Sequence, residues 1–154
     1  MGTPARRRFI SALAGIAAAP LLLARAARAQ GPSDPFAPLV RKLTSGAAVT
    51  PGRVTIDTPR LADNGHSVPL KVSVTSPMTA ADHVRSITLL SGRNPRPLMA
   101  TFHLGPKAGR AQVATRVRLN GTQRVLAIAQ LSDGSYWSGS AEVEVTESAC
   151  LDAG

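Results

Sequence analysis

The feature that most limits the fold is a series of short apolar runs, each ended by Gly, Pro, Asn or Asp. Between Val68 and Thr75, Val or Leu occupies every second position, and alternation with period two indicates a strand with one buried face. We expect further strands at residues 54–56, 84–90, 98–104, 111–119, 123–131 and 136–145. Runs of this kind, with turn residues about every 8 to 12 positions, predict an antiparallel β-sandwich.

Turn and helix signals complete the expected architecture. Asn120-Gly121 and Asp133-Gly134 are the strongest hairpin signals, because these residue types tolerate the positive φ of tight turns. Before the strands, apolar residues at near-helical spacing predict one short helix at about residues 35–45, with Asp34 as a possible cap and Gly46 as its stop. The predicted fold class is therefore all-β with one short N-terminal helix.

The first 29 residues have the layout of an export signal. A basic start precedes an apolar stretch from Ser11 to Ala24, which at about 14 residues is shorter than the roughly 20 that a spanning helix needs. We therefore expect no stable membrane anchor. The expected recognition residues of a twin-arginine signal are Arg6, Arg7 and Phe9. The small residues of the expected cleavage site are Ala27 and Ala29. Export to the periplasm by the twin-arginine route is the expected localisation.

Cleavage before Gln30 changes both length and charge. Removing 29 of the 154 residues leaves 125, enough for one domain with a real core. Thirteen of the 18 Lys and Arg would remain against all nine Asp and Glu, so the net charge falls from +9 to +4. Such a modest excess lacks the clustered basic face typical of nucleic-acid binding. We expect no nucleic-acid partner.

Cys150 is the single cysteine. The cell envelope is oxidising, so an unpaired thiol there is a buried inert residue, a disulfide to another chain or a reactive group. The expected last strand ends near Val145, which places Cys150 up to roughly 16 Å beyond the sheet. We divide the chain into a signal (1–29), a sandwich domain (30–145) and a C-terminal arm (146–154) that bears Cys150.

Other chemistry is weakly supported. Three histidines, His66, His83 and His103, lack a ligand-like spacing, and the adjacent Asp82 and His83 would point to opposite faces of a strand. Glycine-rich phosphate loops and nucleophilic triads are not indicated either. We expect no catalytic residues, no metal site and no cofactor.

Several short segments of the sequence together resemble the SoxY family, whose members are carrier subunits of the periplasmic thiosulfate-oxidising (Sox) system. The resemblance runs from the expected helix to Cys150. It rests on Asp63-Asn64-Gly65-His66-Ser67-Val68-Pro69, Ser76-Pro77-Met78, Asn94-Pro95-Arg96-Pro97-Leu98, Ala100-Thr101-Phe102-His103-Leu104, Thr115-Arg116-Val117-Arg118-Leu119 and Ser132-Asp133-Gly134.

This resemblance implies an immunoglobulin-like sandwich that forms a heterodimer with a SoxZ-like β-protein. It implies that Cys150 covalently holds sulfur intermediates, while a haem-containing thiosulfate oxidase and a sulfate-releasing hydrolase supply the catalysis. The family's thiol lies in a Gly-Gly-Cys-Gly-Gly ending, whereas Ser148-Ala149 and Leu151-Asp152 flank Cys150 here. The alternative is a divergent paralogue that acts as an interaction or scaffold subunit without covalent sulfur carriage.

Overall fold

The computed structural model describes residues 34–148 of the chain. Its elements, in chain order, are α1 (Ala37–Leu43), β1 (Val49–Pro51), β2 (Val54–Asp57), β3 (Leu61–Asn64), β4 (Val68–Val74), β5 (Val84–Ser91), β6 (Leu98–His103), η1 (Pro106–Ala108), β7 (Gln112–Val117), β8 (Gln123–Leu131) and β9 (Tyr136–Glu147).

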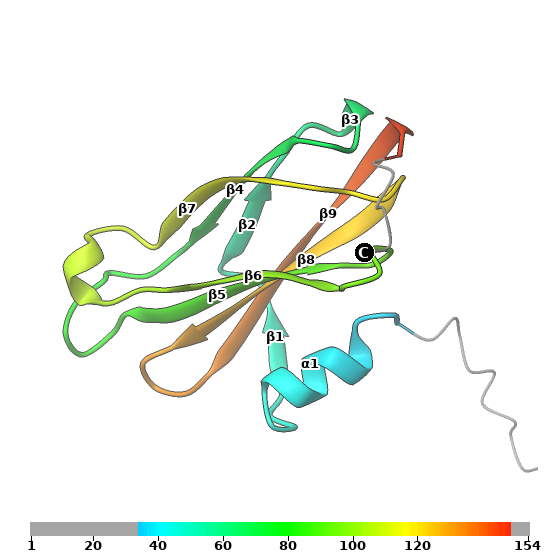
Figure 1. Ribbon diagram of the computed structural model, residues 1–154. Helices are drawn as coiled ribbons and strands as arrows, with labels where there is room; N and C mark the ends of the chain where they lie inside the picture. The colour runs from blue at the N-terminus through cyan, green and yellow to red at the C-terminus, as the bar shows by residue number, and fades with distance from the viewer. Residues whose placement is uncertain (1–33, 149–154) are drawn as a thin grey trace, which may run out of the picture. The chain divides into compact units, whose positions relative to one another are not determined.

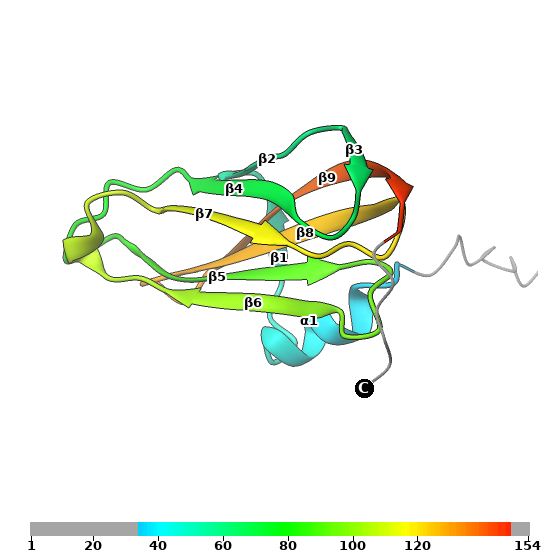
Figure 2. The ribbon, with the colours of Figure 1, turned by 45° about the horizontal axis from the view of Figure 1, so that its top comes forward.

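The strands form two facing sheets (Figures 1 and 2). The large sheet has the order β1-β9-β8-β5-β6, with β3 also paired to β9, and the small sheet has the order β2-β4-β7. The predicted all-β sandwich with one short helix is confirmed. Two features of the large sheet were not expected. Strand β1 pairs with β9 in parallel, and so does β3.

The core lies between the two sheets. Apolar side chains at every second position of a strand point to the same face, and in both sheets that face is the inner one. In β4 the inward side chains of Val68, Leu70, Val72 and Val74 are all buried, and β8 buries Val125, Ala127, Ala129 and Leu131 from the opposite sheet. Each fully buried Val or Leu contributes about 1.5–3 kcal/mol. These strands therefore hold the sandwich together and fix where its loops emerge.

Helix α1 covers part of the outer face of the large sheet (Figure 2). The Phe36 side chain is 1% exposed and forms a second apolar cluster with Leu90 and Ile128. Gly46 ends the helical segment as expected: its φ is 83°, and its N–H donates to the carbonyl of Arg41 at 2.9 Å.

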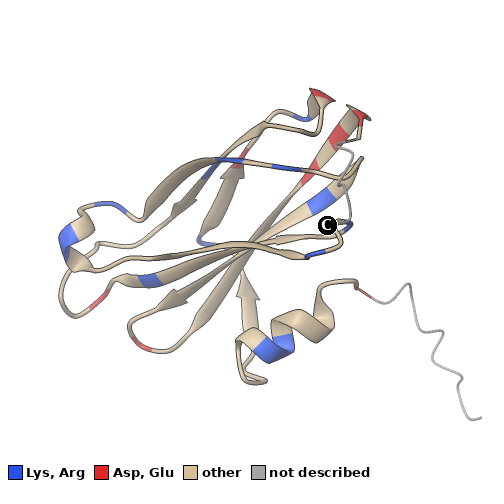
Figure 3. Ribbon diagram, in the orientation of Figure 1, with Lys and Arg blue, Asp and Glu red and all other residues tan. Residues whose placement is uncertain are grey.

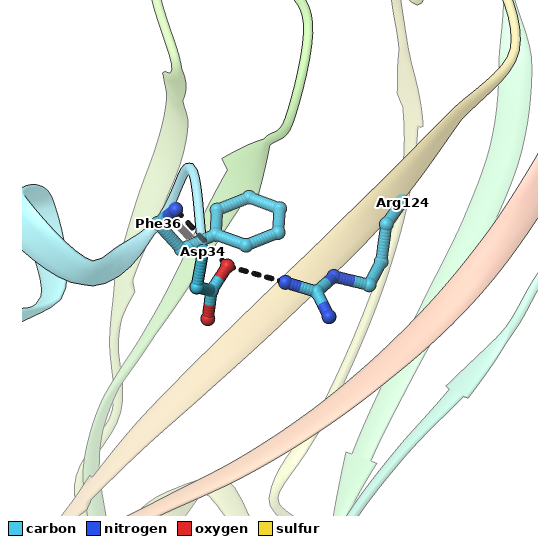
Figure 4. Close-up of polar contacts among 3 residues, drawn as sticks. All are labelled: Asp34, Phe36 and Arg124. Atoms are coloured by element: carbon cyan, nitrogen blue, oxygen red, sulfur yellow. Dashed lines mark hydrogen bonds and ion pairs between the residues drawn. The ribbon is translucent and has the colours of Figure 1, made fainter. Parts of the chain in front are cut away.

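Asp34, the expected cap, does not occupy the N-cap position of α1. The N-cap position is Phe36, which has no side-chain cap hydrogen bond. Asp34 lies two residues earlier, where its Oδ1 accepts a hydrogen bond from the Phe36 N–H at 3.2 Å and pairs with the Arg124 guanidinium (Figure 4). Arg124 also stacks 4.8 Å from the centre of the Phe36 ring. Asp34 thus ties the start of α1 to β8.

The two predicted hairpins have different outcomes. Asp133-Gly134 does join the antiparallel strands β8 and β9, and Gly134 has a φ of 86°. Gly121 also has a positive φ, 83°, but β7 pairs with β4 while β8 pairs with β5 and β9. The hairpin prediction for Asn120-Gly121 is therefore wrong. The turn carries the chain from one sheet to the other, because β7 and β8 bury their apolar faces from opposite sides of one core.

Candidate functional site at the base of the C-terminal arm

Cys150, the predicted attachment site, lies outside the described residues. What the structure places is the base from which the arm departs. Strand β9 continues to Glu147, two residues past the expected end at Val145, and Ser148 is the last described residue. Two residues lie between Glu147 and Cys150, so three Cα–Cα steps place their Cα atoms at most about 11 Å apart.

The end of β9 is fixed by contacts from two neighbouring segments. Strand β3 pairs with it in parallel, with Leu61 opposite Glu144 and Asn64 opposite Glu147. The Glu147 carbonyl accepts a hydrogen bond from the Gly65 N–H at 2.8 Å, and the Val145 N–H donates to Thr122 Oγ1 at 3.0 Å. The chain therefore leaves the sandwich from a rigid point.

Gly121 leaves space beside that point for two other side chains. A Cβ atom added to Gly121 would lie 3.0 Å from Ser148 Oγ and 3.4 Å from Arg93 Nη1. The Arg93 guanidinium and the Ser148 hydroxyl therefore lie against the same turn. A positive charge thus stands at the base of the arm, two residues before Cys150.

A buried polar cluster holds the loop that carries Arg93. Ser91 and Gln123 are 1% and 6% exposed and hydrogen-bond to each other. Gln123 Oε1 also accepts from the Arg93 N–H at 3.1 Å, and its Nε2 donates to Asn94 Oδ1 at 3.2 Å and to the Gly121 carbonyl at 3.2 Å. The cluster joins the β5–β6 loop to the turn at Gly121.

Asn94 extends this link to the end of β7. Its Nδ2 donates to the Arg118 carbonyl at 2.7 Å, and its Oδ1 accepts from the Asn120 N–H at 2.9 Å. Sequence reasoning missed Ser91, Arg93 and Gln123 as parts of this site. The available signal was Gln123, a polar residue at an inward position of a strand that otherwise alternates Val125, Ala127 and Ala129.

The arm base lies between segments of opposite charge (Figure 3). On one side β9 carries Glu142, Glu144 and Glu147, and on the other the β5–β6 and β7–β8 loops carry Arg93, Arg96 and Arg118. The three arginines are exposed, and no carboxylate within residues 34–148 forms an ion pair with them.

One of the three histidines lies near the arm base, because His66 follows Gly65, whose N–H donates to the Glu147 carbonyl. His66 follows β3, where its N–H donates to Asn64 Oδ1 at 3.2 Å, while His103 ends β6. His83 precedes β5, and its Nδ1 lies 3.1 Å from the Thr79 carbonyl. In the described part of the chain, no three His, Cys, Asp or Glu residues gather as a metal site would require.

Asp133 occupies the β8–β9 hairpin, at the start of β9 and away from the arm base. Hydrogen bonds from Ser135, whose N–H donates to Asp133 Oδ1 at 2.8 Å, hold the pKa of the Asp133 carboxyl below its ordinary value. This carboxylate stabilises the turn.

The predicted signal residues, Arg6, Arg7, Phe9, Ala27 and Ala29, also lie outside the described residues. Among the helices of residues 34–148, none has the length and apolar content to cross a membrane.

Comparisons with solved structures identify the same fold in proteins of different function. The sulfur carrier protein SoxY from Chlorobium limicola f thiosulfatophilum matches with a TM-score of 0.61 and 22% identity, over 72% of this chain and 96% of that one. Superoxide reductase (neelaredoxin) from Ignicoccus hospitalis matches with a TM-score of 0.55 and 21% identity, over 61% and 80%. Superoxide reductase from Nanoarchaeum equitans matches with 0.52 and 13%, over 62% and 100%. These likenesses establish the fold.

Family membership comes from the sequence itself. No curated protein matches the chain significantly. The family model described as sulfur oxidation protein SoxY, however, matches residues 40–150, from α1 through the whole sandwich to Cys150. The chain therefore belongs to the SoxY family of sulfur oxidation proteins.

Proposed function

We propose that this protein is a periplasmic carrier that holds sulfur intermediates of thiosulfate oxidation covalently on Cys150. The observation that carries the proposal is the extent of the family match, which ends at Cys150 itself. The structure supports it, because β9 is anchored as far as Glu147 and leaves only a short segment between a rigid support and the thiol.

The proposed chemistry begins with the thiolate. Cys150 S⁻ and thiosulfate form a new S–S bond and give a cysteine S-thiosulfonate, and two electrons pass to the haem-containing oxidase. Water then attacks the sulfonate sulfur in the hydrolase, which releases sulfate and two protons and leaves a persulfide on Cys150. The carrier contributes the nucleophile. Partner enzymes supply the oxidant and activate the water, so the chain is a substrate carrier and not itself an enzyme.

The residues around Cys150 modify this chemistry. Glycines would make a slim arm, whereas Ala149 and Leu151 add bulk and Asp152 adds a negative charge. A neighbouring carboxylate disfavours the negatively charged thiolate and repels a sulfonate.

The partners follow from the same proposal. A SoxZ-like β-protein forms a heterodimer with the sandwich, and the thiosulfate oxidase and the sulfate-releasing hydrolase act in turn on the arm. Export by the twin-arginine signal brings the carrier to the periplasm, where these enzymes operate.

Intact mass tests covalent carriage. The mature chain and its partner are incubated with thiosulfate and the oxidising enzyme and then weighed. We expect a gain equal to one thiosulfonate group on the wild type and none on Cys150→Ser. No adduct on the wild type, or the same adduct on the variant, would contradict the proposal.

The scaffold alternative is favoured by one observation, the replacement of the family's glycines by Leu151 and Asp152. It makes the opposite prediction for the same variant. Under that alternative, Cys150→Ser leaves both partner binding and flux through thiosulfate oxidation unchanged.

A further inference from the structure

The two sides of the large sheet differ in how much of the last long strand is covered. On the β9 side, β1 pairs with residues Tyr136–Ser138 and β3 with residues Glu144–Glu147. Between them the backbone of β2 crosses β9 closely, because Val54 lies directly against Gly139. That edge is therefore occupied along most of its length.

Strand β6 forms the opposite edge and is open. Within residues 34–148 it pairs only with β5, through five residues from Leu98 to His103. Leu98 is 42% exposed, one of the two large apolar side chains that the described residues expose, and Thr101 and His103 are exposed too. An open edge strand presents unpaired backbone N–H and C=O groups that another strand can pair with.

The segment around β6 carries charge of one sign. Residues 83–132 contain no Asp or Glu, although every other part of the sandwich has acidic residues. The same segment holds eight Lys and Arg, which are Arg85, Arg93, Arg96, Lys107, Arg110, Arg116, Arg118 and Arg124. All are exposed except Arg124, which pairs with Asp34.

These cations lie at both ends of β6 (Figure 3). At its start, Arg93 and Arg96 occupy the preceding loop, and the hydrogen bond from Asn94 to the Arg118 carbonyl holds Arg118 beside them. At its end, the Leu104 N–H donates to the Arg85 carbonyl, and Lys107 follows in η1. We call β6 and these flanking cations, with Arg110, the β6 edge surface.

We propose that the β6 edge surface is the docking site of the SoxZ-like partner, which adds an edge strand of its own to β6 and contacts the flanking arginines with acidic side chains. The identity of the partner rests on the proposed function, whereas the surface and the acidic chemistry rest on the charges and topology above. Complementary charge across an interface favours association of specific partners, and exposed Leu98 at the start of β6 adds an apolar contact beside the arginines.

The charge distribution also argues against a second copy of this chain as the occupant. Two β6 strands paired antiparallel would place the basic start of each against the basic end of the other, and like charges across an interface oppose association. A partner at this edge lies next to Arg93, and therefore next to Ser148 at the base of the arm. It would stand beside the base of the arm.

The test titrates the purified chain with the SoxZ-like protein of the same genome by calorimetry, at low and at high salt. We expect the wild-type affinity to fall with salt, and the triple variant R93E/R96E/R118E to bind about tenfold more weakly or worse, with a flatter salt dependence. The matched control is R41E/K42E/R60E, three exposed cations on α1 and before β3, which changes the charge equally and should alter binding less than about twofold.

Hydrogen exchange on the wild-type complex needs no variant. We expect residues 98–103 to gain protection on binding. Protection at β2 or β7 with β6 unchanged, or equal weakening in the two triple variants, would overturn the edge assignment while the partner itself still bound. Self-association of the wild type through β6 in sedimentation, or preferential binding of duplex DNA at these arginines, would overturn it as well. If the SoxZ-like protein does not bind the wild type at all, the partner in the proposed function fails, and the edge assignment fails with it.

Discussion

Gln123 is the residue on which the base of the C-terminal arm depends most. It lies in the core strand β8, and its amide satisfies groups on Ser91, Arg93, Asn94 and Gly121. Replacing it with leucine would keep the volume but leave the Ser91 hydroxyl and the Gly121 carbonyl without this partner. Because buried unpaired polar groups are costly, we expect Gln123→Leu to lower the free energy of unfolding by about 1–3 kcal/mol.

Urea denaturation measures that loss, and amide exchange at Arg93 and Asn94 should accelerate because their loop is no longer tied to β8. The matched control is Gln112→Leu, an exposed glutamine on β7, for which we expect a change within about 0.5 kcal/mol. Equal stability of the two variants would show that the polar cluster does not hold the loop.

Gly139 is required for a different reason, the close approach of β2 to β9. A Cβ at this position would collide with the Val54 carbonyl oxygen and lie 2.9 Å from its carbonyl carbon. Backbone atoms cannot move aside without separating the strands, so we expect Gly139→Ala to destabilise the protein by about 1–3 kcal/mol.

Urea unfolding of Gly139→Ala is compared with that of Gly105→Ala, where an added Cβ meets nothing within 4 Å. We expect a lower unfolding midpoint for the first variant only. If both variants unfold at the wild-type midpoint, the contact between β2 and β9 is looser than the structure indicates.

Individual residues differ in how far the sequence alone could identify them. Cys150 was evident because a single thiol in a chain that begins with the sequence pattern of an export signal demands an explanation. Arg93 was not, since nothing in its own neighbourhood distinguishes it from other surface arginines. Its position beside Ser148 arises from contacts among segments about 30 and 55 residues further along the chain, and such tertiary contacts leave no local pattern.

Among the elements, α1 depends on one side chain. Phe36 inserts between α1 and the outer face of the large sheet, against Leu90 and Ile128, and carries the stacked Arg124. A seven-residue helix is too short to persist without such packing. We expect Phe36→Ala to cost about 3 kcal/mol and to release the helix from the sheet.

Amide exchange reads out this release directly. In Phe36→Ala the N–H groups of Val40 and Thr44 should exchange much faster than in the wild type, while those of β4 should stay protected. Arg41→Ala, an exposed position on the same helix, should leave both sets unchanged. Unaltered exchange at Val40 in Phe36→Ala would mean that other contacts hold α1.

The strands were predictable where their burial alternates and not elsewhere. Strands β2 and β4 to β9 overlap the expected runs because each turns apolar side chains toward the core, although those of β6 are only partly buried. Strands β1 and β3 are three and four residues long and mostly exposed, so they carry no such signal. Likewise, the turn chemistry at Gly121 was right, but local sequence does not specify which sheet receives the next strand.

At the scale of the whole molecule, the basic and acidic residues lie on different sides of the large sheet, and the open edge lies on the basic side. Residues 83–132 are basic and contain the open edge, while the acidic residues of β9 and β3 lie on the opposite side of the large sheet. The arm departs where the two regions meet. In the proposed assembly, the basic side would meet the lasting partner and the arm would serve the enzymes that act in turn.

The twin-arginine signal predicts that the folded chain is exported together with its bound partner. The twin-arginine route moves folded cargo, so a partner already bound to the sandwich would leave the cytoplasm on this one signal. We expect that replacing Arg6 and Arg7 together by lysine retains the uncleaved chain in the cytoplasm and retains the SoxZ-like partner with it.

Cell fractionation and intact mass measure both proteins, and the exported wild type should begin at Gln30. Arg25→Lys is the control, since it keeps the recognition pair. Normal export of the partner beside a retained chain would show that the two proteins cross the membrane separately, and normal cleavage of the double variant would show that another signal directs export.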